Sequence, residues 1–354
     1  MSEVLTTSEW EAALGELCSL SAVVVAVVGP KSSGKSSFAR ELFSRVRAKQ
    51  PCCFIETDLG RPEYIFPGVI SAHDHELNLV GALYYGEVEP SQRPQTYLEQ
   101  VTKICHLVRS KGLNYVIINT HGWVALGQGQ DILDGLLQSA EVTRVVEIVV
   151  GDAIANGNST ASSLVRRNNE KFQVTTLLPA LSGRPKETKA ERNDRFAKEL
   201  LCQMEMFAVG FSQVKLCFPV DVIDRSVPFE FALLGLNTSM VGMFAGEETD
   251  PEAFLGVGLV TGLDLDTQCL FLATRVDPRK VSTCRTLVMG TTNRLEMSLF
   301  PSQLAFPQQT PTAVSSPIAE PPTNPQPYVT SCNLVGFGTA AKRRGLIKRR
   351  RLEH

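Results

Sequence analysis

A glycine-rich segment at residues 29–36 has the residue types and the spacing that bind the phosphates of a nucleotide. It reads Gly-Pro-Lys-Ser-Ser-Gly-Lys-Ser and fits the P-loop pattern G-x-x-x-x-G-K-[ST] at every position. The backbone N–H groups of such a loop approach the phosphates, and the N-terminus of the following helix adds a favourable dipole. Lys35 is expected to contact the β- and γ-phosphates, and the Ser36 hydroxyl to join the Mg²⁺ shell. The predicted phosphate-binding residues are Gly29, Pro30, Lys31, Ser32, Ser33, Gly34, Lys35, Ser36 and Ser37.

An acidic residue, Asp58, ends the next predicted strand and is followed by a Leu-Gly pair. Open α/β sheets bind ligands at the carboxyl ends of their strands, so this side chain is expected beside the phosphates. It could bind Mg²⁺ or accept the proton of an attacking hydroxyl. It could equally be a turn-forming Asp. Glu56 is a weaker candidate for the same roles, and Arg61 could contact a phosphate or pair with Glu63.

A third polar segment, residues 119–123, directly follows another predicted strand and reads Asn-Thr-His-Gly-Trp. Thr120 could donate a hydrogen bond to a phosphate. The ring of Trp123 could stack on a base, although a loop Trp more often packs against the edge of a sheet.

Two arginines, Arg192 and Arg195, lie in a charged segment beyond the last α/β unit. Arginines on such a segment can close over a transferring phosphate and stabilise its charge. The alternative is a solvated helix face, which is the usual place for a run of charges.

The elements that would position these residues alternate between strand and helix. Continuous β-branched runs are typical of strands that are buried on both faces of a parallel sheet. Together with the helices they predict an α/β fold, a doubly wound and mostly parallel P-loop NTPase sheet. The predicted strands are 22–28, 52–57, 115–119 and 145–150, and the predicted helices are 8–20, 37–49, 97–110 and 131–140.

The rest of the chain divides by composition. Residues 1–20 form a lead-in helix, and 21–210 form the P-loop domain, with a lid near 184–200 and a helix expected at 195–207. Short apolar runs separated by turns predict a small β-rich C-terminal domain at 211–300. Residues 301–330 are a Pro-rich linker, and 331–354 are a disordered basic tail.

Composition narrows the class of protein further. The 354 residues are 43% hydrophobic with a net charge of −2, which is typical of a globular protein. The nine cysteines show no CxxC spacing, so neither a zinc site nor a disulfide framework is predicted. No apolar stretch is long enough to span a membrane, and the N-terminus does not resemble a signal peptide. Seven Lys or Arg among residues 342–351 indicate a nuclear or nucleolar address, or a contact with RNA phosphates.

The ordered set of motifs resembles the polynucleotide 5′-hydroxyl-kinase family, the RNA 5′-kinases. The matching segments are 29–37, Asp58-Leu59-Gly60, Asn119-Thr120-x-Gly122-Trp123 and 256–264, and the resemblance covers roughly residues 8–300. The nearer branch is the nucleolar kinase of pre-ribosomal RNA processing. A more distant branch is the kinase subunit of the machinery for mRNA 3′-end cleavage and tRNA splicing.

The resemblance implies a reaction and a set of roles. ATP with Mg²⁺ would be the donor, and a single-stranded RNA 5′ end the acceptor. Lys35 and Ser36 would bind the triphosphate and the metal ion, and Asp58 would bind Mg²⁺ or activate the 5′-hydroxyl. Trp123 would lie near the acceptor nucleotide, while Arg61 is a candidate RNA contact on account of its own charge and not of the resemblance. The resemblance also implies that Thr120 secures the γ-phosphate, that Arg192 and Arg195 close the lid, and that the protein works in the nucleolus with an rRNA-processing endonuclease.

Two departures from the family keep other hypotheses open. The family usually has Gln where this sequence has Arg61, and it has a whole domain before the P-loop, whereas about twenty residues precede the first strand here. A non-catalytic, ATP-binding scaffold of an RNA-processing complex is therefore the second hypothesis. A P-loop GTPase or maturation ATPase is the third, and it ranks low because the sequence has no Asn-Lys-x-Asp guanine motif.

Overall fold

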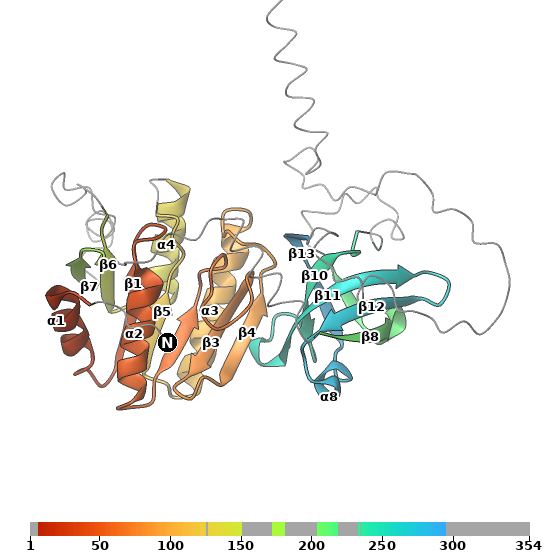
Figure 1. Cartoon of the computed structure of the whole chain (residues 1–354), viewed down its shortest axis with the longest axis horizontal. Helices are drawn as coiled ribbons and strands as arrows, with labels where there is room; N and C mark the ends of the chain where they lie inside the picture. Colours follow the sequence, from red (N-terminus) through yellow and green to blue (C-terminus); the bar gives the residue numbers. More distant parts are fainter. Residues whose placement is uncertain are drawn as a thin grey trace, which may run out of the picture. The chain divides into compact units, whose positions relative to one another are not determined.

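The computed structural model describes residues 6–124, 127–150, 172–180, 204–218, 233 and 235–294, which fall into two compact units (Figure 1). The first unit contains the described residues of 1–187 together with 247–254, and the second contains those of 188–246 and 255–354. The lid arginines Arg192 and Arg195, the Pro-rich linker and the basic tail lie outside the described residues.

The first unit is built on a seven-stranded sheet with the order β4-β3-β2-β5-β1-β6-β7. The central pairs β2–β5, β5–β1, β1–β6 and β6–β7 are parallel, and the β2–β3 and β3–β4 pairs are antiparallel. The predicted mostly parallel α/β sheet is thus confirmed. The strands are β1 (Val23–Val28), β2 (Cys53–Glu56), β3 (Val69–Asp74), β4 (Leu79–Tyr84), β5 (Tyr115–Asn119), β6 (Arg144–Ile148) and β7 (Gln173–Leu177).

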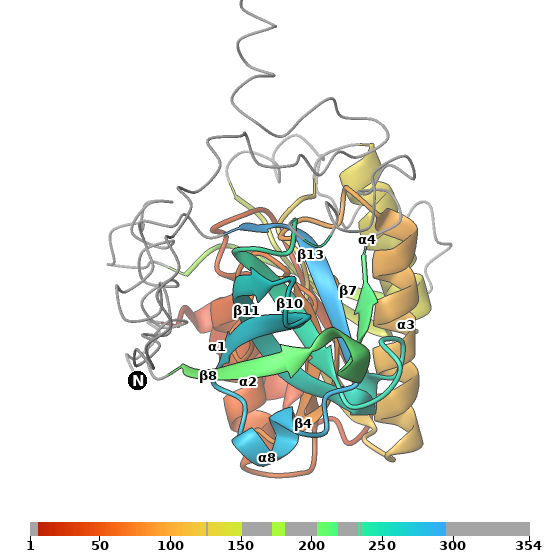
Figure 2. The same ribbon diagram turned by 90° about the vertical axis from the view of Figure 1, so that its right-hand side faces the viewer.

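Helices cover both faces of this sheet. Helices α1 and α2 pack on one face, where Trp10, Leu14, Phe38 and Phe43 join alternate side chains of β1, β5 and β6 in one buried cluster. Helices α3 and α4 lie together, away from α1 and α2 (Figure 2). The helices are α1 (Ser8–Leu17), α2 (Lys35–Arg47), α3 (Pro94–Ser110) and α4 (Gln128–Ser139).

The predicted lead-in helix is part of this core. Its N-cap is Thr7, whose Oγ1 accepts a hydrogen bond from the Trp10 backbone N–H at 3.2 Å. Trp10 is fully buried, and its indole Nε1 donates to the Leu178 carbonyl at 2.8 Å, just beyond β7. Helix α1 is therefore fastened to the edge of the sheet.

The second unit is a six-stranded sheet with the order β8-β12-β11-β10-β13-β9. Its pairs include antiparallel β8–β12, β11–β12 and β10–β13, while β9 pairs parallel to β13. The strands are β8 (Glu205–Gly210), β9 (Lys215–Cys217), β10 (Ser239–Phe244), β11 (Phe254–Asp264), β12 (Cys269–Thr274) and β13 (Thr286–Arg294), with short helices η1 (Phe211–Gln213) and α8 (Pro278–Val281). The short helix η2 (Pro251–Ala253) belongs to the first unit, where it contacts β4 and α3.

The start of the β-rich unit differs from the predicted boundary at residue 211. Residues Glu205–Gly210 form β8 and pair along their whole length with β12. The helix expected at 195–207 is therefore wrong for Glu205–Phe207. The residues Met206–Val209 pair with β12 as part of the sheet. An apolar run this short fits either a strand or a helix, so the sequence pattern alone could not decide between them.

Two further sequence expectations can be compared with the described residues. None of the described helices is long and apolar enough to cross a membrane. The described cysteines are free thiols, and among the described residues no group of three or more His, Cys, Asp or Glu side chains is arranged to hold a metal ion.

Candidate nucleotide and acceptor site

The predicted phosphate cradle lies between β1 and α2, at the carboxyl end of the sheet. Gly29 has φ 150°, and a Cβ there would lie 2.5 Å from the Ile148 carbonyl oxygen of β6. Gly34 caps α2 with φ 102°, a left-handed conformation that favours glycine. Glycine is therefore required at Gly29 by sterics and is favoured at Gly34 by backbone conformation.

The interior of the loop has polar groups suited to a bound triphosphate. The Ser33 side chain is 1% exposed, and its hydroxyl has no hydrogen-bond partner among the described residues. Unpaired buried hydroxyls are costly, so this one fits a site completed by a ligand. Lys35 is 4% exposed, and its Nζ donates only a long bond, 3.3 Å, to the Pro30 carbonyl. These residues fit the phosphates of a nucleotide.

Burial lowers the pKa of Lys35, while the nearby carboxylates Asp58 and Glu56 act to raise it. The positive charge of the Lys35 ammonium group and the negative charges of Asp58 and Glu56 therefore act on each other within the site. Lys35 and Asp58 are therefore close enough for the carboxylate to influence the pKa of the ammonium group.

Asp58 has the turn geometry that was the alternative to a catalytic role. Its Oδ1 accepts hydrogen bonds from the backbone N–H groups of Gly60 at 3.1 Å and Arg61 at 3.2 Å. Both bonds use Oδ1, and they fix the carboxylate at the strand end. Turn formation and a chemical role are therefore compatible. Arg61 is exposed, and Glu63 pairs with Arg40 of α2 at 3.1 Å.

Glu56 and Asn119 connect this acidic loop to the P-loop. The sequence made Glu56 only a weaker candidate and assigned no role to the Asn119 side chain. The Asn119 Nδ2 group donates to both oxygens of the Glu56 carboxylate, at 2.9 and 3.2 Å, and to Ser36 Oγ at 3.3 Å. The buried Asn119 Oδ1 has no partner among the described residues. Ser36 and Asp58 offer hard oxygen donors, the type that Mg²⁺ prefers, and Mg²⁺ usually keeps several waters and substrate phosphates as ligands. The residues fit Mg²⁺.

The Asn119–Trp123 segment packs tightly between neighbours. The Thr120 hydroxyl is buried and donates to the Val27 carbonyl at 2.7 Å, so the predicted phosphate contact requires this hydroxyl to rotate away from β1. A Cβ at Gly122 would lie 3.1 Å from the Lys31 backbone nitrogen. Trp123 is half-buried, and its ring lies against Gly129 in the first turn of α4. The segment and the P-loop are therefore in close contact.

His121, to which the sequence assigned no role, is 3% exposed and lies edge-on to Tyr97, with ring centroids 5.9 Å apart. Burial lowers the pKa of His121 to about 4, with a further contribution from Lys35. The imidazole is therefore neutral near pH 7.

A fourth loop, between β4 and α3, reaches the site without a motif that would have identified it. Glu89 pairs with Lys31 of the P-loop at 2.9 Å, although both side chains are exposed. A Cβ at Gly60 would lie 3.1 Å from the Val88 carbonyl oxygen. The loop thus borders both the P-loop and the Asp58 loop.

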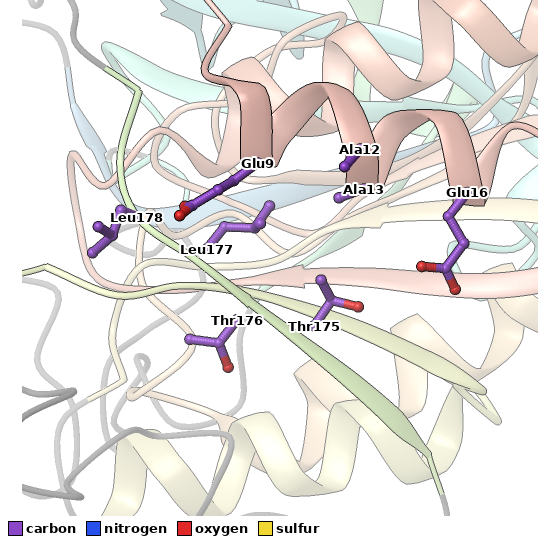
Figure 3. Close-up of a pocket in the computed structure, with 8 residues that line it drawn as sticks. All are labelled: Glu9, Ala12, Ala13, Glu16, Thr175, Thr176, Leu177 and Leu178. Carbon is purple, nitrogen blue, oxygen red and sulfur yellow. The ribbon is translucent and has the colours of Figure 1, made fainter.

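A separate pocket of about 440 Å³ lies between α1 and β7 (Figure 3). Glu9 and Glu16 border it from the helix, while Leu177 points from the strand toward the helix. None of the predicted site residues lines it.

The fold and site define a nucleotide-binding P-loop domain, and comparisons with known proteins give its relatives. Residues 29–201 match the family model described as mRNA cleavage and polyadenylation factor CLP1 P-loop. The polynucleotide 5′-hydroxyl-kinase NOL9 of Arabidopsis thaliana is 24% identical over 329 residues, which cover 80% of this chain and 89% of that protein. The NOL9 kinase of Danio rerio is 34% identical over 142 residues, covering 37% of this chain and 20% of its own length. The grc3 kinase of Schizosaccharomyces pombe is 28% identical over 143 residues, or 34% of this chain and 19% of that protein.

Solved structures agree with the fold. A chain of the wild-type Clp1p–Pcf11p complex superposes with a TM-score of 0.64 at 12% identity, covering 82% of this chain and 80% of its own. A second Clp1p–Pcf11p structure gives 0.62 at 14% identity, with 79% and 77% covered. The chain is thus similar to polynucleotide 5′-hydroxyl-kinases named NOL9 and Grc3, and its residues 29–201 match a P-loop domain of the CLP1 type. It spans most of the Arabidopsis relative and about a fifth of the fish and yeast relatives.

Proposed function

We propose that the chain is an ATP-dependent polynucleotide 5′-hydroxyl kinase that transfers the γ-phosphoryl group of ATP to an RNA 5′ end. One observation carries the proposal: the P-loop lysine Lys35 and the carboxylate Asp58 follow the carboxyl ends of β1 and β2, and Asp58 is near enough to raise the pKa of Lys35. The names of the relatives favour this reaction over a non-catalytic scaffold.

The roles follow from the geometry. Asp58, held by the Gly60 and Arg61 backbone N–H groups, accepts the proton of the RNA 5′-hydroxyl as that oxygen attacks the γ-phosphorus. The bond between the γ-phosphorus and the β,γ-bridging oxygen breaks, and ADP leaves with that oxygen. Lys35 stabilises the charge on the equatorial oxygens. Mg²⁺, when bound at Ser36 and Asp58, would neutralise charge on the β- and γ-phosphates.

The acceptor side is assigned to exposed or half-exposed groups near Asp58. Arg61 is exposed on the loop that carries the base, where its charge can attract an RNA phosphate. Trp123 offers a partly exposed ring for stacking on the terminal base. Thr120 is assigned to the γ-phosphate after its hydroxyl rotates, and Arg192 and Arg195 are assigned to the lid.

The cellular setting is part of the proposal. The relatives carry the names NOL9 and Grc3, and the basic segment 342–351 suits a nucleolar address or an RNA contact. We assign the chain to pre-rRNA processing in the nucleolus, with an rRNA-processing endonuclease as partner.

The experiment is transfer of labelled γ-phosphate from ATP to a 5′-hydroxyl RNA oligonucleotide, with a 5′-phosphorylated oligonucleotide as the blocked acceptor. Wild-type protein should label only the 5′-hydroxyl RNA. Lys35→Ala and Asp58→Asn should each lose transfer, but Asp58→Asn should retain ATP binding because the P-loop is unchanged. Wild-type protein that binds ATP and leaves every acceptor unlabelled would instead establish the scaffold. Turnover retained by Asp58→Asn would show that the base is misassigned.

A further inference from the structure

Glu56 is a fully buried carboxylate and the last residue of β2. It lies two residues before Asp58, which is on the loop that follows the strand. Its Oε1 accepts from the Asp58 backbone N–H at 3.0 Å, and its Oε2 accepts from the Glu63 backbone N–H at 2.9 Å. The two ends of the Asp58 loop are thus fastened to one side chain. A buried carboxylate is costly to desolvate, and burial raises the pKa of Glu56, while the backbone and side-chain donors offset part of that cost.

The same carboxylate reaches the phosphate side of the site through one intermediate. Asn119 Nδ2 donates to both Glu56 oxygens and also to Ser36 Oγ. The Asn119 carbonyl in turn accepts from the Thr57 backbone N–H at 3.0 Å and from Thr57 Oγ1 at 2.8 Å. Glu56 and Asn119 therefore link the P-loop serine to the Asp58 loop.

We propose that Glu56 is a positioning residue that holds Ser36, through Asn119, and the Asp58 loop in the one arrangement that binds Mg²⁺ with ATP. This inference rests on the proposed function only for its effect on turnover. The carboxylate does not touch substrate in this role. It acts because both of its oxygens are needed, one for each end of the loop, while Asn119 bridges to the serine.

A substitution that keeps the shape of the side chain tests this directly. Glu56→Gln retains one acceptor oxygen and replaces the other by an NH₂ group. That group would face Asn119 Nδ2 together with the backbone N–H of either Asp58 or Glu63, all of which are donors. The Asp58 loop and Ser36 should therefore no longer be held in fixed positions relative to each other, even though the Gln side chain fills the same space. Glu63→Gln is the matched control, because it changes a carboxylate on the same loop whose side chain pairs with Arg40.

The measurement is the affinity for ATP, by calorimetry, first in EDTA and then with Mg²⁺. We expect Glu56→Gln to bind metal-free ATP as the wild type does and to lose about 10-fold or more of the tightening that Mg²⁺ provides. Asn119→Ala should lose the same tightening, and the double variant should lose no more than either single variant, because both act in one chain of contacts. Glu63→Gln should keep it.

Kinetics and folding complete the test. In the transfer assay, Glu56→Gln should lower kcat with little change in KM for RNA. Wild-type Mg²⁺ tightening in folded Glu56→Gln and Asn119→Ala proteins would overturn the inference. If Glu56→Gln fails to fold, Asn119→Ala decides alone, since it leaves the backbone bonds of the carboxylate intact. If the wild type transfers no phosphate but the variants still lose Mg²⁺ tightening, the inference holds and the kinase assignment fails.

Discussion

Replacing Trp10 should destabilise the first unit and loosen the P-loop together, because one buried ring contacts both. The indole is fully buried, packs edge-on against Phe38 with ring centroids 5.1 Å apart, and donates to the Leu178 carbonyl. Its outer ring atom Cη2 lies 3.4 Å from the position of a Cβ at Gly34, the N-cap of α2.

The magnitude follows from what the ring buries. Truncation of a fully buried Trp to Ala costs about 3–5 kcal/mol, a large part of a domain stability of about 5–15 kcal/mol. Trp10→Phe keeps most of the ring contact with Phe38 but leaves the Leu178 carbonyl without the indole N–H. That loss is worth about 1 kcal/mol. The ranking wild type, Trp10→Phe, Trp10→Ala therefore separates the hydrogen bond from the packing.

The assay is urea unfolding followed by far-UV circular dichroism, with and without ATP. The first unit is identified as the transition that ATP shifts to higher urea, because a ligand stabilises only the unit that binds it. With a slope of about 2 kcal/mol per M, Trp10→Ala should lower that midpoint by about 2 M. Since the chain has two Trp residues, Trp10→Phe also leaves Trp123 as the single indole fluorophore, which can report on binding at the acceptor side.

An ATP-sensitive midpoint that stays within about 0.5 M of wild type in Trp10→Ala would refute this reasoning. It would mean that α1 is attached to the sheet without contributing to its core. Ala12→Ser, at an exposed position of the same helix that borders the pocket between α1 and β7, is the control for changes in α1 as such and should leave the midpoint unchanged.

Three further predictions address the loop, the acceptor side and pH. Gly29→Ala should abolish ATP binding, because its Cβ would meet the Ile148 carbonyl; calorimetry that finds wild-type affinity would contradict this. Arg61→Gln should raise KM for RNA and reduce the salt dependence of RNA binding by about one charge, while KM for ATP is unchanged. Burial lowers the pKa of His73 to about 4, so its stabilising contribution is complete above about pH 6.5 and is lost as the pH falls toward 4. His121 has the same pKa shift, so the two histidines together lose stability over this pH range. His73→Gln should roughly halve this combined loss of unfolding free energy, measured by urea unfolding at a series of pH values. An unchanged dependence of the unfolding free energy on pH would show that His73 does not report on folding.

Much of the fold could be predicted because its central strands carry a strong local signal. The run Val23–Val28 is β-branched throughout apart from one alanine, and Tyr115–Asn119 is apolar up to its last residue, so both indicate strands buried on two faces. The antiparallel strands β3 and β4 were not predicted. Their connection is polar, and Asp74 Oδ1 binds the backbone N–H groups of Glu76 and Asn78 there, a local turn that gives no sign of sheet pairing.

Strand β7 was missed for a related reason. Its sequence, Gln173–Leu177, is mostly polar, and its place beside β6 depends on α1 covering Leu177 from the other side. Edge strands of this kind are specified by what packs on them more than by their own propensity.

The residues of the candidate site also divide into those that the sequence could identify and those that it could not. Lys35 and Asp58 could be found from motif spacing, because both lie at fixed offsets from strand ends. Glu56 could not be ranked correctly, because its importance depends on full burial between β3 and β5, a tertiary property. Asn119 was within reach of the sequence: an amide at the carboxyl end of a strand next to the P-loop strand is placed to contact the loop, and its position in the motif was the available signal.

The contacts of Asn119 also explain why the site is made of three strand ends and one P-loop serine. Its backbone pairs with Val27 in the β1–β5 ladder and its carbonyl accepts from Thr57, while its side chain bonds Ser36 and Glu56. The ends of β1, β2 and β5 are therefore fixed relative to one another before any ligand binds. Preorganised groups of this kind need no rearrangement as charge develops in a reaction. The hydroxyl of Thr120, committed to β1, extends the same ladder by one residue, so the segment that follows is positioned by the sheet itself.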